Sequence, residues 1–213
     1  MNRKIRQSAL SALSVAVVFM SPCAAVAAGA AITKVDVVDK PKHEDLLSPD
    51  FSGVVSKNLK LKNWLQIEAK IKVQMKPEPK SKTCDRLVVK WYVAVDNPDK
   101  AGTYLKLTKD IEYVNVPLSD DVYCSVYLSP ASIKRLTGLD RSGRSAVKFI
   151  GFEVIVDGKV VADSTDRGAD KWWTMPSDKT AESTVVPLLN KDETAFAHIW
   201  WDRYAEIKAK GNP

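Results

Sequence analysis

The chain of 213 residues contains little of the chemistry that enzymes use near neutral pH. It has two histidines, His43 and His198, and neither lies in a His-Glu-x-x-His motif or beside a Gly-x-Ser-x-Gly elbow. It also has no glycine-rich phosphate loop and no dinucleotide fingerprint. We therefore identify no catalytic residue and expect no cofactor, and the sequence predicts a protein that is not an enzyme.

The acidic residues lack the spacing of a metal-binding loop. Asp120 and Asp121 are adjacent, and Asp163, Asp166 and Asp170 are spread over a polar stretch. A calcium hand places its ligands at regular intervals within one loop, which these positions do not match. Ordinary loop acidity explains them more simply, and no metal site is expected.

Long hydrophobic runs are also scarce, and the one clear example lies near the start of the chain. Residues 9–20 form an uncharged, mostly apolar run that follows three basic residues and precedes the small-residue triplet at 25–27. This order is typical of a secretory signal peptide, so we expect residues 1–27 to be removed by cleavage between Ala27 and Ala28. The run has about 12 residues where about 20 are needed to cross a bilayer, so no stable membrane span is expected. The predicted location is the periplasm or the cell surface.

The positive charge is modest once the leader is set aside. The leader carries three of the 32 basic residues and none of the 26 acidic ones, which leaves 29 against 26 and a net charge of +3. Such a balance does not favour nucleic acid as a partner. A lysine cluster between Lys57 and Lys82 is best explained as a solvated strand face that discourages edge-to-edge aggregation. Contact with an anionic polymer or surface is the alternative.

Cysteine is rare, with Cys23, Cys84 and Cys124 as the only three. Cys23 leaves with the predicted leader, so the exported chain keeps an even pair in an oxidising compartment. We predict a disulfide between Cys84 and Cys124, which would stabilise the fold by about 4 kcal/mol in the chain-entropy model. A redox or metal pair is disfavoured because the cysteines lack Cys-x-x-Cys spacing and a neighbouring histidine.

The dominant pattern along the chain is the alternation of apolar and polar residues, which is typical of strands with one buried face. The clearest case is 65–75, whereas 87–95 is apolar on both faces, as expected for a central strand. A third run, 122–128, places Cys124 on the buried side. Further strands are predicted at 32–38 and, as one or two strands, at 104–116.

Turn and cap residues predict a hairpin and a helix. Asp157-Gly158 separates the strands predicted at 147–156 and 159–162, and this dipeptide supplies the positive φ angles of a tight two-residue turn. Ser129 followed by a proline begins a short helix that Gly138 ends. Helical spacing also continues through 192–210, where an extended aromatic segment is the alternative.

These elements predict one mainly β domain over residues 28–213, an antiparallel immunoglobulin-like β-sandwich with a short helix near 130–137. A C-terminal extension, helical or extended, is expected from about residue 171. Trp91 follows Cys84 by only seven residues, so the expected disulfide is not the inter-sheet bridge of antibody domains.

Two adjacent tryptophan pairs are the main functional hint. Neighbouring side chains diverge on strands and on helices, so one member of each pair is expected to face outward. We interpret Trp173 and Trp201 as the candidate binding surface, because exposed indoles stack on sugars and are enriched at protein interfaces. The alternative is that Trp172 and Trp200 lie in the core while the second member of each pair fills the gap between the C-terminal segment and the sandwich.

Four segments carry a resemblance to a known group. In these segments the chain resembles exported, immunoglobulin-like proteins of Verrucomicrobia such as Akkermansia. The segments are Asn63–Glu68, Lys90–Val93, Leu188–Thr194 and Trp200–Tyr204. That group is encoded with type IV pilus components, so the resemblance implies a role at the cell surface or in pilus assembly.

Two functions of different class follow as hypotheses. The first is a non-enzymatic envelope or surface protein that serves pilus assembly or adhesion by contacts with other envelope or pilus proteins. The second is a glycan-binding module that uses exposed tryptophans. Association with further copies of the same chain also stays open.

Overall fold

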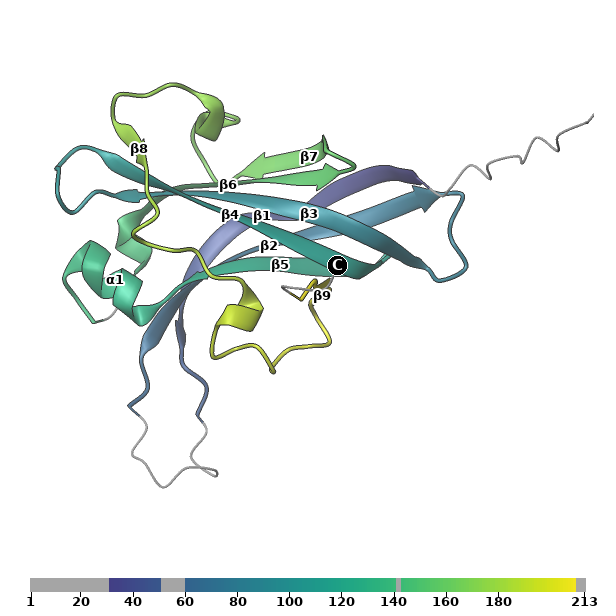
Figure 1. Ribbon diagram of the computed structural model, residues 1–213, viewed down its shortest axis with the longest axis horizontal. Coiled ribbons are helices and arrows are strands. Elements are labelled where there is room, and N and C mark those ends of the chain that lie inside the picture. The colour runs from purple at the N-terminus through teal and green to yellow at the C-terminus, as the bar shows by residue number, and fades with distance from the viewer. Residues whose placement is uncertain (1–30, 51–59, 141–142, 210–213) are drawn as a thin grey trace, which may run out of the picture.

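The computed structural model describes residues 31–50, 60–140 and 143–209 (Figure 1). The predicted leader, the cleavage point between Ala27 and Ala28, and Cys23 lie outside the described residues. The described ranges are mainly β with one short α-helix, α1 (Pro130–Thr137), and three short 3₁₀ helices, η1 (Arg144–Ala146), η2 (Trp172–Thr174) and η3 (Lys191–Glu193). Their strands are β1 (Ala31–Leu47), β2 (Asn63–Lys76), β3 (Thr83–Asp96), β4 (Tyr104–Pro117), β5 (Asp121–Leu128), β6 (Val147–Val156), β7 (Lys159–Thr165), β8 (Thr180–Glu182) and β9 (Glu206–Ile207).

The strands form two sheets. The smaller sheet is antiparallel, in the order β1-β2-β5. The larger sheet has the order β7-β6-β3-β4-β8, with β9 also paired to β4, and it curls into half a barrel (Figure 1). Because β8 runs parallel to β4, this sheet is mixed. The expectation of a purely antiparallel arrangement was therefore wrong at this edge.

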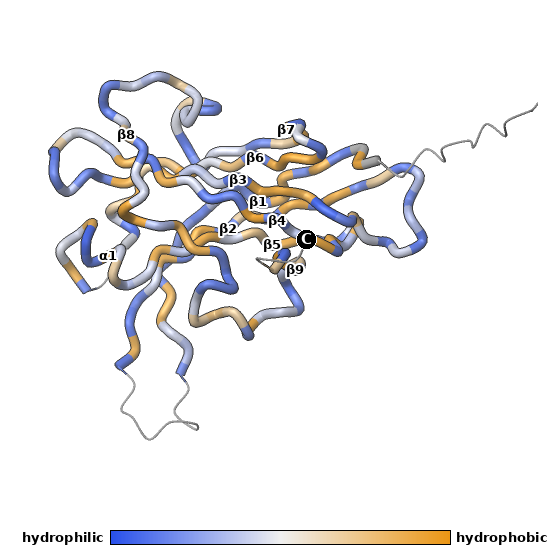
Figure 2. The backbone as a smooth tube through the Cα atoms, in the orientation of Figure 1, coloured by the Kyte–Doolittle hydropathy of each residue, from blue (hydrophilic) through white to orange (hydrophobic). Residues whose placement is uncertain are grey.

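The core lies between the two sheets, where their apolar faces meet (Figure 2). Alternate residues are buried over most of β2, as the period-two pattern predicted, whereas β5 is buried on both faces from Cys124 to Leu128. β3, which lies between β4 and β6, is buried on both faces from Trp91 to Val95, where its outer face is also covered. Trp91 packs on Phe152 at 5.2 Å between ring centroids.

The locally encoded elements form as predicted. Asp157 and Gly158 adopt φ angles of 48° and 74° at the tight turn between β6 and β7. The Ser129 side chain accepts a hydrogen bond from the backbone N–H of Ser132 at the start of α1, and Gly138 ends the helix with φ of 71°. Residues 104–117 form one strand, β4.

In the C-terminal segment, residues 186–207, η3 is followed by a series of turns and bends that leads into the short strand β9. No α-helix forms in this segment, so the helix predicted for 192–210 was wrong. The segment joins both sheets: β9 pairs with β4, while Leu189 and Tyr204 form isolated bridges to Tyr127 and Tyr123 of β5. It thus closes the side of the molecule where β4 and β5 lie next to each other (Figure 1). In the described ranges, no helix is long and apolar enough to span a membrane.

Candidate functional site

The first tryptophan pair covers the outer face of the larger sheet. Trp173 is only 4% exposed and stacks on Tyr92 of β3, with 5.0 Å between ring centroids and an interplanar angle of 8°. Its indole N–H donates to Glu153 Oε1 of β6 at 3.1 Å. Trp172 packs beside it against Phe149 at 5.9 Å. The interpretation of Trp173 as an exposed binding residue was therefore wrong.

Gly151 explains why Trp173 fits so closely on the sheet. A Cβ atom built at this glycine would lie 2.1 Å from the Trp173 ring, so only a residue without a side chain allows the indole to reach the backbone of β6. A glycine inside a strand pattern marks such a close approach. Together with the apolar outer face of 87–95, Gly151 was a signal in the sequence that this face is covered.

The C-terminal segment places a second aromatic cluster on the outer face of the smaller sheet. Phe196 is 1% exposed and stacks on Tyr127 of β5 at 5.5 Å and on Trp200 at 5.8 Å. Trp64 of β2 meets Phe196 edge-on at 5.7 Å. None of these four rings belongs to the core cluster between the sheets. Aromatic stacking thus attaches the segment to the outside of β2 and β5.

A polar network beside this cluster holds the segment in register. Gln66 Nε2 of β2 donates to the hydroxyls of Tyr127 and Tyr204 at 3.1 and 3.0 Å, and the Tyr204 hydroxyl donates to Glu68 Oε2. Burial raises the pKa of Tyr204, and the neighbouring Tyr127 and Glu68 raise it further. The hydroxyl therefore stays protonated and continues to donate at any physiological pH.

Trp201 is the exposed member of the second pair, at 79%. Trp200 adopts the left-handed region with φ of 55°, so it packs on Phe196 while the chain turns its neighbour toward solvent. This confirms the outward orientation expected for Trp201. The alternative that Trp172 and Trp200 lie in the core was wrong, because both are half-buried outside the core cluster, with Trp200 on the outer face of the smaller sheet.

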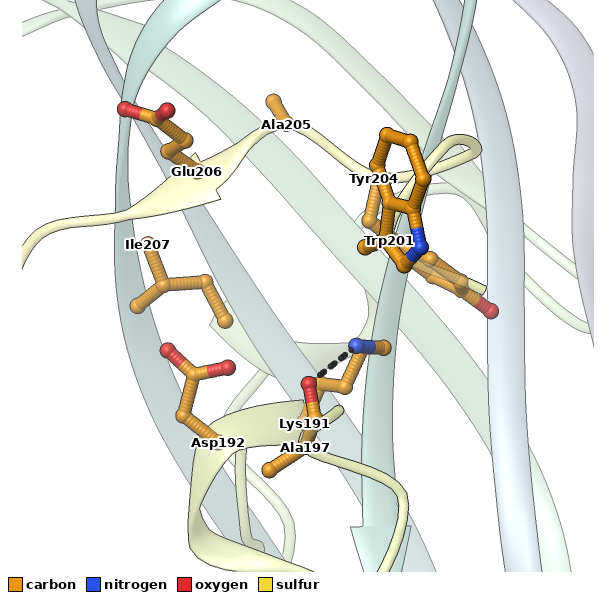
Figure 3. A pocket seen from close by; sticks show the side chains of 8 residues that line it. All are labelled: Lys191, Asp192, Ala197, Trp201, Tyr204, Ala205, Glu206 and Ile207. Carbon is orange, nitrogen blue, oxygen red and sulfur yellow. Dashed lines mark hydrogen bonds between the residues drawn. The ribbon is translucent and has the colours of Figure 1, made fainter. Parts of the chain in front are cut away.

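Trp201 borders a cavity of about 290 Å³ on the C-terminal segment (Figure 3). In Figure 3, Trp201 and Tyr204 lie on one side, and Asp192, Glu206 and Ile207 lie on the other. Lys191 is 5% exposed at the base, and its ammonium donates to the Ala197 carbonyl at 2.7 Å beneath the Tyr204 ring. The cavity therefore offers an indole face with carboxylates across from it. We call this region the Trp201 surface.

Lys191 supports the segment from within. Burial lowers the pKa of its ammonium, and the nearby Asp192 carboxylate opposes that shift. The ammonium is held by a carbonyl and an aromatic face. Lys191 therefore packs beneath the cavity. Asp192 and Glu206 are exposed and place their carboxylates at the rim.

The cysteines correct another prediction, because Cys84 and Cys124 are both free and both buried. They lie on strands of different sheets, and each thiol has another partner. The Cys84 thiol donates to the Arg86 carbonyl at 3.3 Å, whereas the Cys124 thiol is hydrogen-bonded to the Tyr113 side chain. The sequence pattern indicated that both cysteines are buried, but it did not indicate whether the two thiols face each other. The expected disulfide is absent from this structure.

Thiol titration tests this correction. Burial raises the pKa of Cys84 and raises that of Cys124 to about 12, so little reactive thiolate forms at pH 8. In the chain that begins at Ala28, purified without reductant, we expect no fast reaction of the native protein with a thiol reagent. We expect two thiols per chain to react in guanidinium chloride. If the denatured, unreduced protein shows none, the disulfide exists after all.

The two histidines lie far apart in the sequence and in different settings: His43 lies on β1 and is half-buried. His198 is exposed, and among the described residues no cluster of three or more metal-ligating side chains is found. Three of the acidic positions considered as metal ligands form ion pairs: Asp121 with Lys70, Asp163 with Lys171 and Asp166 with Arg167.

Comparison with known proteins places the chain in a wider group. A protein-family model matches residues 27–211. A solved structure from Akkermansia muciniphila is 40% identical, has a TM-score of 0.76, and aligns over 84% of this chain and 95% of its own. A search of the curated proteins found no match. The expected similarity to an Akkermansia protein is therefore confirmed, while the pilus association stays a prediction.

Proposed function

The chain belongs to the family whose model spans residues 27–211, and from that premise we propose an exported, non-enzymatic protein of the periplasm or cell surface. In this proposal it serves type IV pilus assembly or adhesion by binding another envelope or pilus protein through the Trp201 surface. The proposal includes an immunoglobulin-like relationship for the two packed sheets.

The observation that carries the proposal is the exposure of Trp201 on a segment whose other aromatic side chains are packed. A tryptophan that is 79% exposed has no packing role in this chain, while its neighbours Phe196 and Tyr204 anchor the backbone on both sides of it. Tryptophan is enriched at the centres of protein interfaces. Because the backbone on both sides of Trp201 is anchored, it loses little conformational entropy when a partner binds.

The charges around Trp201 favour a particular partner side chain. Asp192 and Glu206 are exposed on the far side of the cavity. An indole face and two carboxylates together suit a lysine or arginine of the partner, through a cation–π contact and an ion pair. We therefore propose that the partner inserts a basic side chain into this cavity.

Replacement of Trp201 by alanine tests the proposal. We expect capture of partners from detergent-solubilised envelope fractions to fall at least tenfold, because an interface hot spot contributes about 2 kcal/mol or more. The midpoint of urea unfolding should stay unchanged because the indole is exposed. Val185→Ala, at a site 60% exposed on the preceding loop, is the control. Equal capture by Trp201→Ala and the native protein would contradict the proposal.

A glycan-binding function is the second candidate, and the same cavity favours it. Sugar rings stack on indole faces, and carboxylates such as those of Asp192 and Glu206 accept hydrogen bonds from hydroxyls. This function predicts that glycans quench tryptophan fluorescence and that Trp201→Ala removes the quenching. A broad glycan array without signal would eliminate it, whereas protein capture would remain measurable.

A further inference from the structure

A larger depression of about 680 Å³ lies away from the Trp201 surface and shares no lining residue with it. Residues from β1, β4, η1, β6 and the loop after β7 meet there, so only the folded chain assembles it. Its volume is in the range of pockets that hold small molecules. The residues that matter here are His43, Tyr104, Arg144, Lys148, Phe149 and Arg167.

Basic groups dominate this depression, but their charges are not equally available. Lys148 Nζ pairs with Asp96 at 3.0 Å. Arg167 pairs with Asp166 at 3.2 Å and also donates to the Lys148 carbonyl at 2.8 Å. Arg144 is exposed, and no carboxylate pairs with it in the part of the chain that the structure describes. One guanidinium with free donors therefore faces the depression, supported by two cations that are already neutralised.

Aromatic rings form another part of the lining. Phe149 and Tyr104 are half-buried and meet edge-on, with 6.2 Å between centroids and an interplanar angle of 80°. Trp172 packs behind Phe149 at 5.9 Å. These contacts hold the rings in place, and their remaining exposed area offers an apolar surface to a ligand.

We propose that this depression binds an acidic sugar, a hexose that carries a carboxylate or a sulfate group. The Arg144 guanidinium binds the anionic group through two parallel N–H donors, a geometry that suits both oxyanions. The apolar face of the sugar ring lies on Phe149 and Tyr104. The proposal is independent of the function assigned to the Trp201 surface.

Other anionic partners fit less well. A nucleic acid needs an extended basic stripe, whereas the available charge here is concentrated on Arg144. An acidic peptide carries several carboxylates, and this depression offers a single available guanidinium to pair with them. Its carboxylates would also make no use of the apolar ring faces of Phe149 and Tyr104. A ligand that combines one anionic group with one apolar ring face uses both features.

Calorimetric titration of the chain from Ala28 onward tests the proposal with four probes: glucuronate, glucose 6-sulfate, glucose and inorganic sulfate. We expect at least one acidic sugar to bind. Glucose and inorganic sulfate should each bind at least tenfold more weakly than that sugar, or not at all. Comparison of the two acidic sugars distinguishes the carboxylate from the sulfate. Binding of glucose or inorganic sulfate as tight as that of the acidic sugars would overturn the proposal, as would the absence of binding to both acidic sugars at millimolar concentration.

Matched variants assign the binding to this depression. Arg144→Gln should weaken it at least tenfold, since a charge-assisted bidentate contact is lost. Phe149→Leu should weaken it several-fold. Arg86→Gln is the control: Arg86 lies eight residues along β3 from Ala94, which pairs with Phe149, and that is about 26 Å of strand. Equal loss in the Arg86 and Arg144 variants, or Arg144-dependent binding of oligoaspartate as tight as that of the sugar, would overturn the assignment.

The pH dependence of affinity is a second measurement. Burial lowers the pKa of His43, and Arg144 and Arg167 lower it further, while Asp166 and a hydrogen bond with the Arg144 backbone raise it. His43 therefore gains its charge below its usual pH range and adds a second cation to the depression. Affinity for glucose 6-sulfate, which stays ionised, should rise as the pH falls below about 6.5. His43→Gln should abolish the rise, and a rise that persists in that variant would contradict the placement of the anion beside His43.

Discussion

Replacement of Trp173 by alanine is expected to lower the free energy of unfolding by about 3–5 kcal/mol, the loss typical of a fully buried aromatic side chain. The indole is 4% exposed, stacks on Tyr92 and covers Gly151. Its removal exposes the outer face of β3 and β6 to water and breaks the hydrogen bond to Glu153. Urea unfolding followed by far-ultraviolet circular dichroism measures the change.

Trp201→Ala is the matched control for this prediction, because it deletes the same side chain at an exposed position. It should change the free energy of unfolding by no more than about 0.5 kcal/mol. Similar losses in the two variants would mean that Trp173 does not cover the sheet as described. The pair thus separates a packing tryptophan from a binding tryptophan.

Phe196→Ala is expected to cost about 3–5 kcal/mol as well, but by a different route. Phe196 lies outside the core cluster between the sheets and joins the C-terminal segment to Tyr127, Trp64 and Trp200. Its loss should release the segment and uncover the side where β4 and β5 lie next to each other. Limited proteolysis should then cleave within residues 186–207 of the variant while the native chain resists.

Two variants check that result. Phe196→Leu keeps an apolar side chain in the cluster and should retain most of the protection. Val185→Ala shortens an exposed side chain just before the segment and should have no effect. If Phe196→Ala is as resistant to protease as the native chain, the aromatic cluster does not hold the segment. The Trp201 surface would then lack the rigid support that the proposed binding function relies on.

Most strands were predictable from the sequence because their signals are local. The alternation in 65–75 follows directly from a sheet with one buried face, and it became β2. Asp157-Gly158 and the caps at Ser129 and Gly138 act through backbone geometry over a few residues, and the structure confirms all three.

The helical spacing in 192–210 failed because its aromatic residues pack on a sheet rather than along one helix face. Phe196 and Trp200 are four residues apart, which suits a helix, yet the backbone between their stacked rings forms irregular turns, and Trp200 has a positive φ angle. The contacts that favour this arrangement come from Trp64 and Tyr127, far away in the sequence.

The sequence by itself therefore determined the mainly β class, the principal strands, the hairpin and the helix, since each depends on residues that are close in the chain. The tertiary structure alone decided that Trp173 is covered while Trp201 is exposed, that Cys84 and Cys124 have separate partners, and that Arg144 faces a depression beside Phe149. The physical reason is that exposure, thiol pairing and charge neutralisation depend on the register of strands and on the path of the C-terminal segment. These are set by contacts between residues that are distant in the sequence.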